Sequence, residues 1–283
     1  MNSPNLVTPF DQTVILGTRW GHMIALRCDP FQTASLALYG EWARGEADAI
    51  CSFLKPGDLA LDVGANVGTL TIPMAKRVGS GGMVIAFEPQ RAPFMCLCGN
   101  VALTHCLNQV RCLNAAAGDV EEIIQVPVVD INKPFNVGGV RLQDANYDAA
   151  VNLKKENVQM LTIDGLNLSR VNLIKIDVET MEAKVLAGAF DTVQRCRPVI
   201  CAEALFEAFN PDGTIESRNV DAMKLFFKET NYEPRYFIST LFYEDNNRYC
   251  PDNIFPGYDR NIIAIPNEME KPAWFNALAS VYE

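Results

Sequence analysis

Short apolar runs alternate with longer stretches of helical periodicity through the middle of the chain. The runs at 59–63, 83–87, 110–114, 172–176 and 198–202 are nearly unbroken, which predicts strands buried on both faces. The stretches at 67–78, 92–107 and 181–189 have the spacing of helices. Parallel strands need long crossovers, and helices usually supply them. The pattern therefore predicts the α/β class, with a mostly parallel sheet covered on both faces.

The beginning of the chain departs from this alternation. Two apolar strands at 13–16 and 22–26 flank a glycine-bounded turn, and a helical stretch follows at 41–54. The segment Lys55–Pro56–Gly57–Asp58 then breaks the chain sharply. We expect two units: a small N-terminal cap, residues 1–54, and a main domain, residues 55–283.

The end of the chain departs from it as well. A helix is expected at 219–230, and strands at 235–241 and 261–265 follow with no helix between them. Two strands joined only by a loop can pair antiparallel. We expect the sheet to end in an antiparallel hairpin.

Composition and charge narrow the class of protein. With 49% hydrophobic and 20% charged residues the chain is globular, and no apolar run approaches the length of a membrane span. The formal net charge of −10 disfavours nucleic acid and anionic lipid surfaces as partners. The first residues lack the features of a signal peptide, and nine irregularly spaced cysteines suit a reducing compartment. We therefore expect a cytoplasmic protein.

A glycine-containing turn follows the first strand of the main domain, and it carries Asp62, Gly64, Ala65, Asn66 and Gly68. Gly64 allows a ligand close to the backbone, and Gly68 allows the next helix to pack on the sheet. A dinucleotide fingerprint has glycine where this chain has Asn66. The acid at Asp62 would repel a pyrophosphate, and it suits a positive group such as the amino-acid end of a sulfonium cofactor.

Further polar residues follow the next two strands. Glu88 ends the second strand, 26 residues after Asp62, where it can accept hydrogen bonds from both hydroxyls of a ribose. Asn114 and Asp119 follow the third strand, where an adenine would lie. Asp119 could accept a hydrogen bond from the adenine amino group, and it is equally consistent with an ordinary turn acid.

Three segments together resemble the class I S-adenosylmethionine (SAM)-dependent methyltransferases, and among them the FkbM family. They are residues 61–68, residues 87–89, and residues 173–179 followed by Glu182 and Val185–Leu186. The resemblance extends from about residue 39 to residue 266, and it departs from the family pattern at Thr180, where glycine is usual. It implies a Rossmann-like, seven-stranded sheet with SAM across the carboxyl ends of its strands. It also implies O-methylation of a hydroxyl group on a sugar, lipid or secondary metabolite.

Transfer of a methyl group to oxygen requires removal of the hydroxyl proton. Asp177 and Glu179 follow one predicted strand and Glu203 follows the next, so we expect them at one edge of the sheet as candidate bases. Asp177 would also lie beside the cofactor. Crowded carboxylates raise one another's pKa, which tunes one of them toward base catalysis. The same oxygens could hold Mg²⁺; we favour a base without a metal.

Several other features have two interpretations. Glu182 either takes part in the site or offsets the dipole of a first helical turn, and His22 is a second possible base if the cap folds over the cofactor. Trp20, Trp42 and Tyr39 either line the acceptor pocket or pack the cap, and residues 136–139 have the flexibility of a lid. Three other functions stay open: a SAM-binding protein without catalysis, an N-methyltransferase, and an NAD-dependent oxidoreductase.

Overall fold

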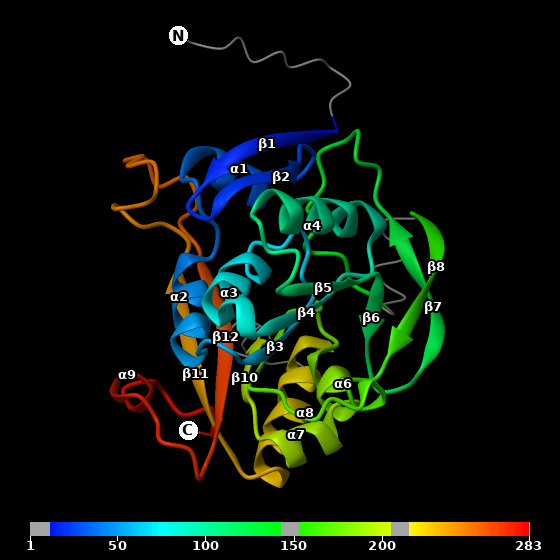
Figure 1. The fold of residues 1–283 in the computed structure, drawn as a ribbon, viewed down its shortest axis with the longest axis vertical. Helices are drawn as coiled ribbons and strands as arrows, with labels where there is room; N and C mark the ends of the chain where they lie inside the picture. Colours follow the sequence, from blue (N-terminus) through cyan, green and yellow to red (C-terminus); the bar gives the residue numbers. More distant parts are fainter. Residues whose placement is uncertain (1–11, 143–152, 205–214, 283) are drawn as a thin grey trace.

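A seven-stranded sheet forms the centre of the molecule (Figure 1). The computed structural model describes residues 12–142, 153–204 and 215–282. The strand order is β11-β12-β10-β9-β3-β4-β5, and the five strands from β10 to β5 run parallel. These are β3 (Leu59–Val63), β4 (Met83–Phe87), β5 (Val110–Leu113), β9 (Leu173–Ile176) and β10 (Val199–Glu203). The prediction of an α/β protein with a mostly parallel sheet is confirmed.

The sheet ends in a hairpin, as the missing helix near the end of the chain predicted. Strand β11 (Tyr232–Thr240) pairs antiparallel with β12 (Tyr258–Pro266), and β12 pairs antiparallel with β10. Both strands are longer than predicted, because their pairing continues along nine residues on each side.

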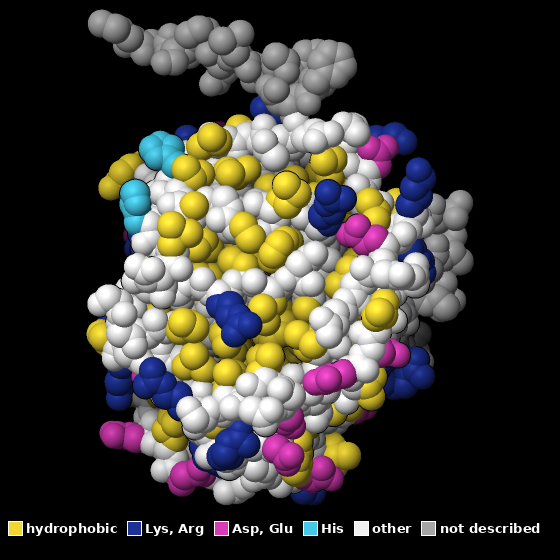
Figure 2. Space-filling model, turned by 45° about the vertical axis from the view of Figure 1, so that its right-hand side comes forward, with side chains coloured by type: hydrophobic (Ala, Val, Ile, Leu, Met, Phe, Trp, Pro, Cys, Tyr) yellow, Lys and Arg dark blue, Asp and Glu magenta, His cyan; other side chains and the backbone are white. Residues whose placement is uncertain are grey.

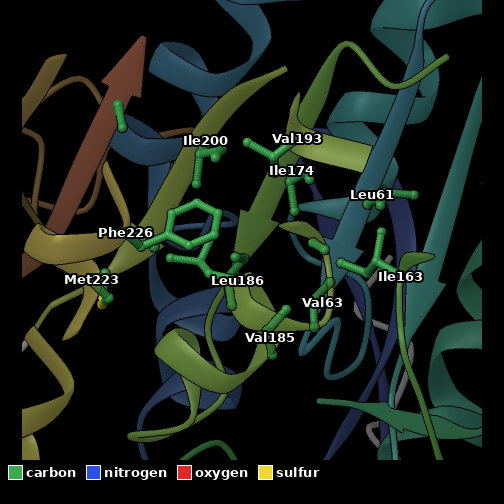
Figure 3. Close-up of a cluster of buried hydrophobic side chains, with 14 of the residues drawn as sticks. Leu61, Val63, Ile163, Ile174, Val185, Leu186, Val193, Ile200, Met223 and Phe226 are labelled. Carbon is green, nitrogen blue, oxygen red and sulfur yellow. The ribbon is translucent and has the colours of Figure 1, made fainter. Parts of the chain in front are cut away.

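Helices cover both faces of the sheet, and the alternation of side chains along each strand decides which face each residue meets. On one face, Leu61, Ile85 and Ile174 pack against α6 (Glu182–Ala187), α7 (Phe190–Cys196) and α8 (Ile215–Glu229). Figure 3 labels Leu61 and Ile174 in this layer. On the other face, Ala60 and Val84 pack against α2 (Arg44–Phe53), α3 (Thr71–Val78) and α4 (Arg91–Leu103). Each large side chain buried in these layers contributes roughly 1.5–3 kcal/mol to folding. Asp62 and Lys175 lie on the face of α2 and α3.

The N-terminal residues pack against this second layer. Strands β1 (Thr13–Thr18) and β2 (Gly21–Leu26) form a two-stranded antiparallel sheet, and α1 (Gln32–Leu38) was not predicted. Asn100 of α4 joins β2 to the glycine turn, because its Nδ2 donates to the carbonyl oxygens of Ile24 at 2.9 Å and Val67 at 2.8 Å. The division of the chain at residue 54 stays a prediction.

A third sheet, with three strands, was not predicted. Its strands are β6 (Ala115–Ala117), β7 (Glu122–Val128) and β8 (Lys154–Leu161), in the order β6-β8-β7. In β7 and β8 exposed and buried residues alternate, so they lack the unbroken apolar runs of the central strands.

Helix boundaries differ from the predicted ones for local reasons. Helix α3 begins at Thr71 and not at 67, because Asn66 (φ +50°) and Gly68 (φ +92°) hold the turn in a left-handed conformation. Short 3₁₀ turns cover Gly79–Gly81 and Asp164–Leu166, and α9 (Ala273–Asn276) lies near the end of the chain. Among the helices described, none is both long and apolar enough to cross a membrane.

Candidate functional site

The strand register places a row of charged side chains on the face covered by α2 and α3. Asp62 of β3 lies opposite Lys175 of β9, and Lys175 lies opposite Cys201 of β10. Side chains two residues apart on a strand point to the same face, so Asp177 and Glu203 lie above this row at the carboxyl ends of their strands. Four carboxylate residues, Asp62, Asp177, Glu203 and Glu88, thus mark the ends of four adjacent strands.

Lys175 is the buried cation at the centre of this row. Its Nζ lies 3.4 Å from Asp62 Oδ1 and 3.4 Å from Asp177 Oδ2, and it donates to the carbonyl oxygen of Gly64 at 3.1 Å. Burial alone would lower the pKa of Lys175, but the carboxylates of Asp177, Asp62 and Glu46 raise it, so the ammonium form persists. The second oxygen of Asp62 accepts a hydrogen bond from Thr71 Oγ1. Asp62 therefore lies beneath the site and holds Lys175 and Thr71.

The glycine turn fits closely between the ends of β4 and β9. Gly64 has a φ of +83°, and any Cβ at this position would collide with the carbonyl oxygen of Asp177. The N–H groups of Gly64 and Ala65 donate to the carbonyl oxygen of Phe87 at 3.1 and 2.8 Å. The turn is thus fixed to both neighbouring strands, and glycine is required at residue 64.

Glu88 is buried directly after β4, and it faces the glycine turn. Its Oε2 accepts a hydrogen bond from the N–H of Asn66 at 2.8 Å, and its Oε1 accepts one from the N–H of Gln90 at 2.8 Å. Burial raises the pKa of Glu88 to about 7. Each carboxylate oxygen accepts more than one hydrogen bond, so a ligand's hydroxyl groups can still be bound here.

Asn114 and Asp119 were both predicted near the adenine, but their surroundings in the structure differ. Asn114 Nδ2 donates to the carbonyl oxygens of Glu88 at 2.9 Å and Pro89 at 3.1 Å, so it braces the loop that carries Glu88. Asp119 is exposed and lies against Gly188. Neither residue lines the cavities described next.

Two adjoining cavities lie along this edge of the sheet. The smaller one, about 70 Å³, is next to Glu88, Pro89 and Gln90. The larger one, about 230 Å³, extends toward β12 and α2 and includes Trp42. Gly64, Asn66, Gly138, Asp177 and Glu179 line both. The larger cavity is strongly acidic, with the carboxylates of Asp29, Glu46, Asp177, Glu179, Glu203 and Asp259 in its wall.

The three predicted base candidates come together in the larger cavity. One carboxylate oxygen of each of Asp177, Glu179 and Glu203 lies within 4.8 Å of the other two. Burial, with help from Asp177, raises the pKa of Glu179 to about 8, and the same causes raise the pKa of Glu203. The Glu179 carboxyl group can exchange a proton with a ligand near neutral pH, and the spacing of the three groups also suits a divalent cation.

Glu179 and Thr180 both have left-handed backbone conformations, with φ values of +53° and +80°. Such values are rare for a β-branched residue. The hydroxyl oxygen of Thr180 is buried, without a hydrogen-bond partner in the described part of the chain. Glu182 supports this turn from below, because its Oε1 accepts a hydrogen bond from the N–H of Val178 at 3.0 Å. Glu182 is only 1% exposed, so the interpretation of this residue as a solvated first-turn acid is wrong.

The remaining candidates from the cap separate into lining and packing residues. Trp42 lines the larger cavity, as do residues 136, 138 and 139 of the predicted lid. Tyr39 is buried, and its hydroxyl group donates to the carbonyl oxygen of Asp252 at 2.9 Å, which identifies it as a packing residue. Trp20 packs against the core under α2 to α4. His22 is exposed on the β1–β2 hairpin and lines neither cavity. Histidine side chains are coloured cyan in Figure 2.

Sequence reasoning missed Glu46 and Asp259 as lining residues. Glu46 shares the buried stripe of α2 with Ala47 and Ile50, one and four residues later. An acid on the apolar face of a helix is a signal that the sequence contained. Asp259 reaches the site only through the antiparallel return of β12, which its local sequence does not reveal.

Comparison with known proteins identifies the family. Residues 62–234 match the model of the methyltransferase FkbM domain. The chain belongs to the FkbM methyltransferase family. This confirms the resemblance seen in the glycine turn, in Glu88 and in the segment around Asp177.

One relative and one solved structure illustrate the likeness. The 31-O-demethyl-FK506 methyltransferase FkbM of Streptomyces tacrolimicus is 27% identical over 161 residues, which are 49% of this chain and 62% of that protein. The match thus spans less than two thirds of that relative's length. The O-methyltransferase from Bacillus cereus, solved in complex with SAH (S-adenosylhomocysteine), has a TM-score of 0.50 at 14% identity. That alignment covers 83% of this chain and 86% of the other, and it shows the shared class I methyltransferase fold.

Proposed function

We propose that this FkbM methyltransferase binds SAM across the carboxyl ends of β3, β4 and β9. We propose further that it methylates a hydroxyl group of a sugar, lipid or secondary metabolite. One observation carries the proposal: the two cavities adjoin at Gly64 and Asp177, with buried Glu88 in one and the acidic group in the other. An elongated ligand with a nucleoside at one end and a charged group at the other fits this arrangement.

The residues around the smaller cavity suit the nucleoside end of the cofactor. Glu88 would accept hydrogen bonds from the ribose hydroxyls, while the backbone of Gly64, Ala65 and Asn66 would contact the ligand. Gly68 leaves room for Leu97 of α4, and Asn114 holds the Glu88 loop. Bound SAM supplies a methyl group on a sulfonium, ready for in-line displacement.

The acidic group in the larger cavity suits the acceptor. Asp177, Glu179 or Glu203 would take the proton of the acceptor hydroxyl, and a pKa of about 8 places Glu179 near the pH at which a general base works best. We retain a base without a metal as the proposal. The Streptomyces relative is, by its name, a methyltransferase that acts on an oxygen of its substrate, which supports an oxygen acceptor here.

Label transfer tests the proposed reaction. The protein is incubated with SAM carrying a radioactive methyl group and with fractionated small molecules from its host. We expect label in a fraction that contains hydroxyl groups, and loss of most labelling with Glu179→Gln or Asp177→Asn although SAH still binds. Chelation with EDTA should leave the labelling rate unchanged. Binding of SAH without labelling of any fraction would favour a SAM-binding protein without catalysis.

A further inference from the structure

Glu46 is a buried carboxylate that faces the larger cavity. It is the third residue of α2, is 6% exposed, and lines the wall beside Lys175. Its carboxylate has no hydrogen-bond partner among the residues that the structure describes, although Lys175 stabilises its charge at a distance. A carboxylate withdrawn from water without a donor is costly. The position therefore calls for a ligand that brings a positive group.

Three neighbouring carboxylates are less suited to that group. The oxygens of Asp62 face Thr71 and Lys175, and Asp62 lines neither cavity. Asp29 Oδ1 accepts hydrogen bonds from the N–H groups of Phe31 and Gln32. Asp177 belongs to the group of base candidates, and its Oδ2 faces Lys175.

The place of Glu46 matches one end of the proposed cofactor. With the ribose at Glu88, the rest of the molecule passes Gly64 and enters the larger cavity, because the two cavities share that residue. Glu46 lies in this second cavity, on a helix packed over the face that carries Asp62 and Lys175. Burial is the main cause that raises the pKa of Glu46, with further contributions from Asp259, Asp177 and Asp62. A neighbouring ammonium would offset that cost.

We propose that Glu46 binds the ammonium group at the amino-acid end of the cofactor. The inference rests on the proposed SAM-dependent function. It assigns a binding role to a residue outside the segment 62–234 that matches the family domain. It also gives helix α2 a function in the site, besides covering the sheet.

Two ligands separate this role from a structural one. SAH has the amino-acid end, whereas 5′-methylthioadenosine has the same nucleoside and sulfur but lacks it. Isothermal titration calorimetry with Glu46→Gln should show SAH affinity lowered about ten- to a hundred-fold, the effect of losing a hydrogen bond to a charged group. The affinity for 5′-methylthioadenosine should stay within about twofold of wild type. Asp48→Asn is the matched control on the same helix, because its side chain is 56% exposed and points outside the cavity wall.

Three results would contradict the assignment in different ways. Wild-type affinity for SAH in Glu46→Gln would overturn it, because the ammonium would then have another partner. An equal loss for both ligands would also overturn it, since that result indicates a disturbed fold. Absence of SAH binding in the wild-type protein would refute the proposed function itself, and the role of Glu46 with it.

Discussion

The ammonium group of Lys175 lies 3.4 Å from a carboxylate oxygen of Asp62, and both side chains are almost completely buried. The same ammonium group contacts the carbonyl oxygen of Gly64 and the carboxylate of Asp177. One cation thus connects the glycine turn, the strand beneath it and a base candidate. The positions of all three depend on this residue.

Removal of Lys175 should destabilise the protein strongly. Lys175→Met leaves Asp62 buried without its counter-charge, and breaking a buried pair in this way typically costs about 3–5 kcal/mol. Urea unfolding of the two proteins measures the difference. Lys133→Met is the control, because that side chain is 78% exposed and its loss should cost less than about 0.5 kcal/mol. A cost at Lys175 no greater than at Lys133 would show that the buried pair contributes nothing.

Gly64→Ala tests the contact between the turn and Asp177. Gly57 has a similar φ, +93° against +83°, but a Cβ there would meet no atom within 4 Å. Both substitutions carry the cost of a left-handed alanine, about 1–2 kcal/mol. Gly64→Ala should cost about 1–3 kcal/mol more, because the backbone of Asp177 must also move. Equal losses in the free energy of unfolding would contradict the close approach.

The central strands could be predicted from the sequence because their environment is uniform. Residues 59–63 and 83–87 are strands with the predicted bounds, since burial on both faces leaves an unbroken apolar run. In the three-stranded sheet, β7 and β8 are half exposed, and β6 consists of three buried alanines, which have no preference for strands. Their pairing is decided by tertiary contacts that the local sequence does not record.

The site could be predicted only where chain order and sheet order coincide. Asp177 and Glu203 follow adjacent parallel strands, and the carboxyl ends of parallel strands lie at the same edge of a sheet, so the two side chains meet there. Glu46 and Asp259 come from a covering helix and an antiparallel strand, and their place depends on packing. The sequence likewise did not show that Lys175 faces Asp62, because the two residues come from different strands.

Thr180→Gly should stabilise the protein. Threonine at a φ of +80° has the cost of a left-handed side chain and a buried hydroxyl group without a described partner. Glycine removes both of these costs, but it also raises the conformational entropy of the unfolded chain. The expected net gain in the free energy of unfolding is therefore about 1 kcal/mol. Thr180→Ala keeps the Cβ and should gain less. Guanidinium unfolding compares the three proteins, and a Thr180→Gly variant less stable than wild type would refute the strain.

The stability of the protein should fall as the pH rises from about 4.5 to about 7. Burial raises the pKa of Glu182 to about 7, whereas the unfolded chain loses this proton near its usual pKa of about 4.3. Between these values the folded state holds a proton that the unfolded state has released, so rising pH favours unfolding. Each such group contributes a slope of at most about 1.4 kcal/mol per pH unit. Urea unfolding at pH 5, 6, 7 and 8 should show a shallower slope for Glu182→Gln, and identical slopes would contradict the raised pKa.

The direct test of the proposed cofactor site is calorimetric titration of the wild-type protein and Glu88→Gln with SAH and with NAD. We predict one SAH site in the wild-type protein, no heat with NAD, and at least a tenfold weaker SAH affinity in Glu88→Gln, since a buried acceptor for the ribose is lost. No heat with SAH, or a variant that binds SAH as tightly as wild type, would contradict the account.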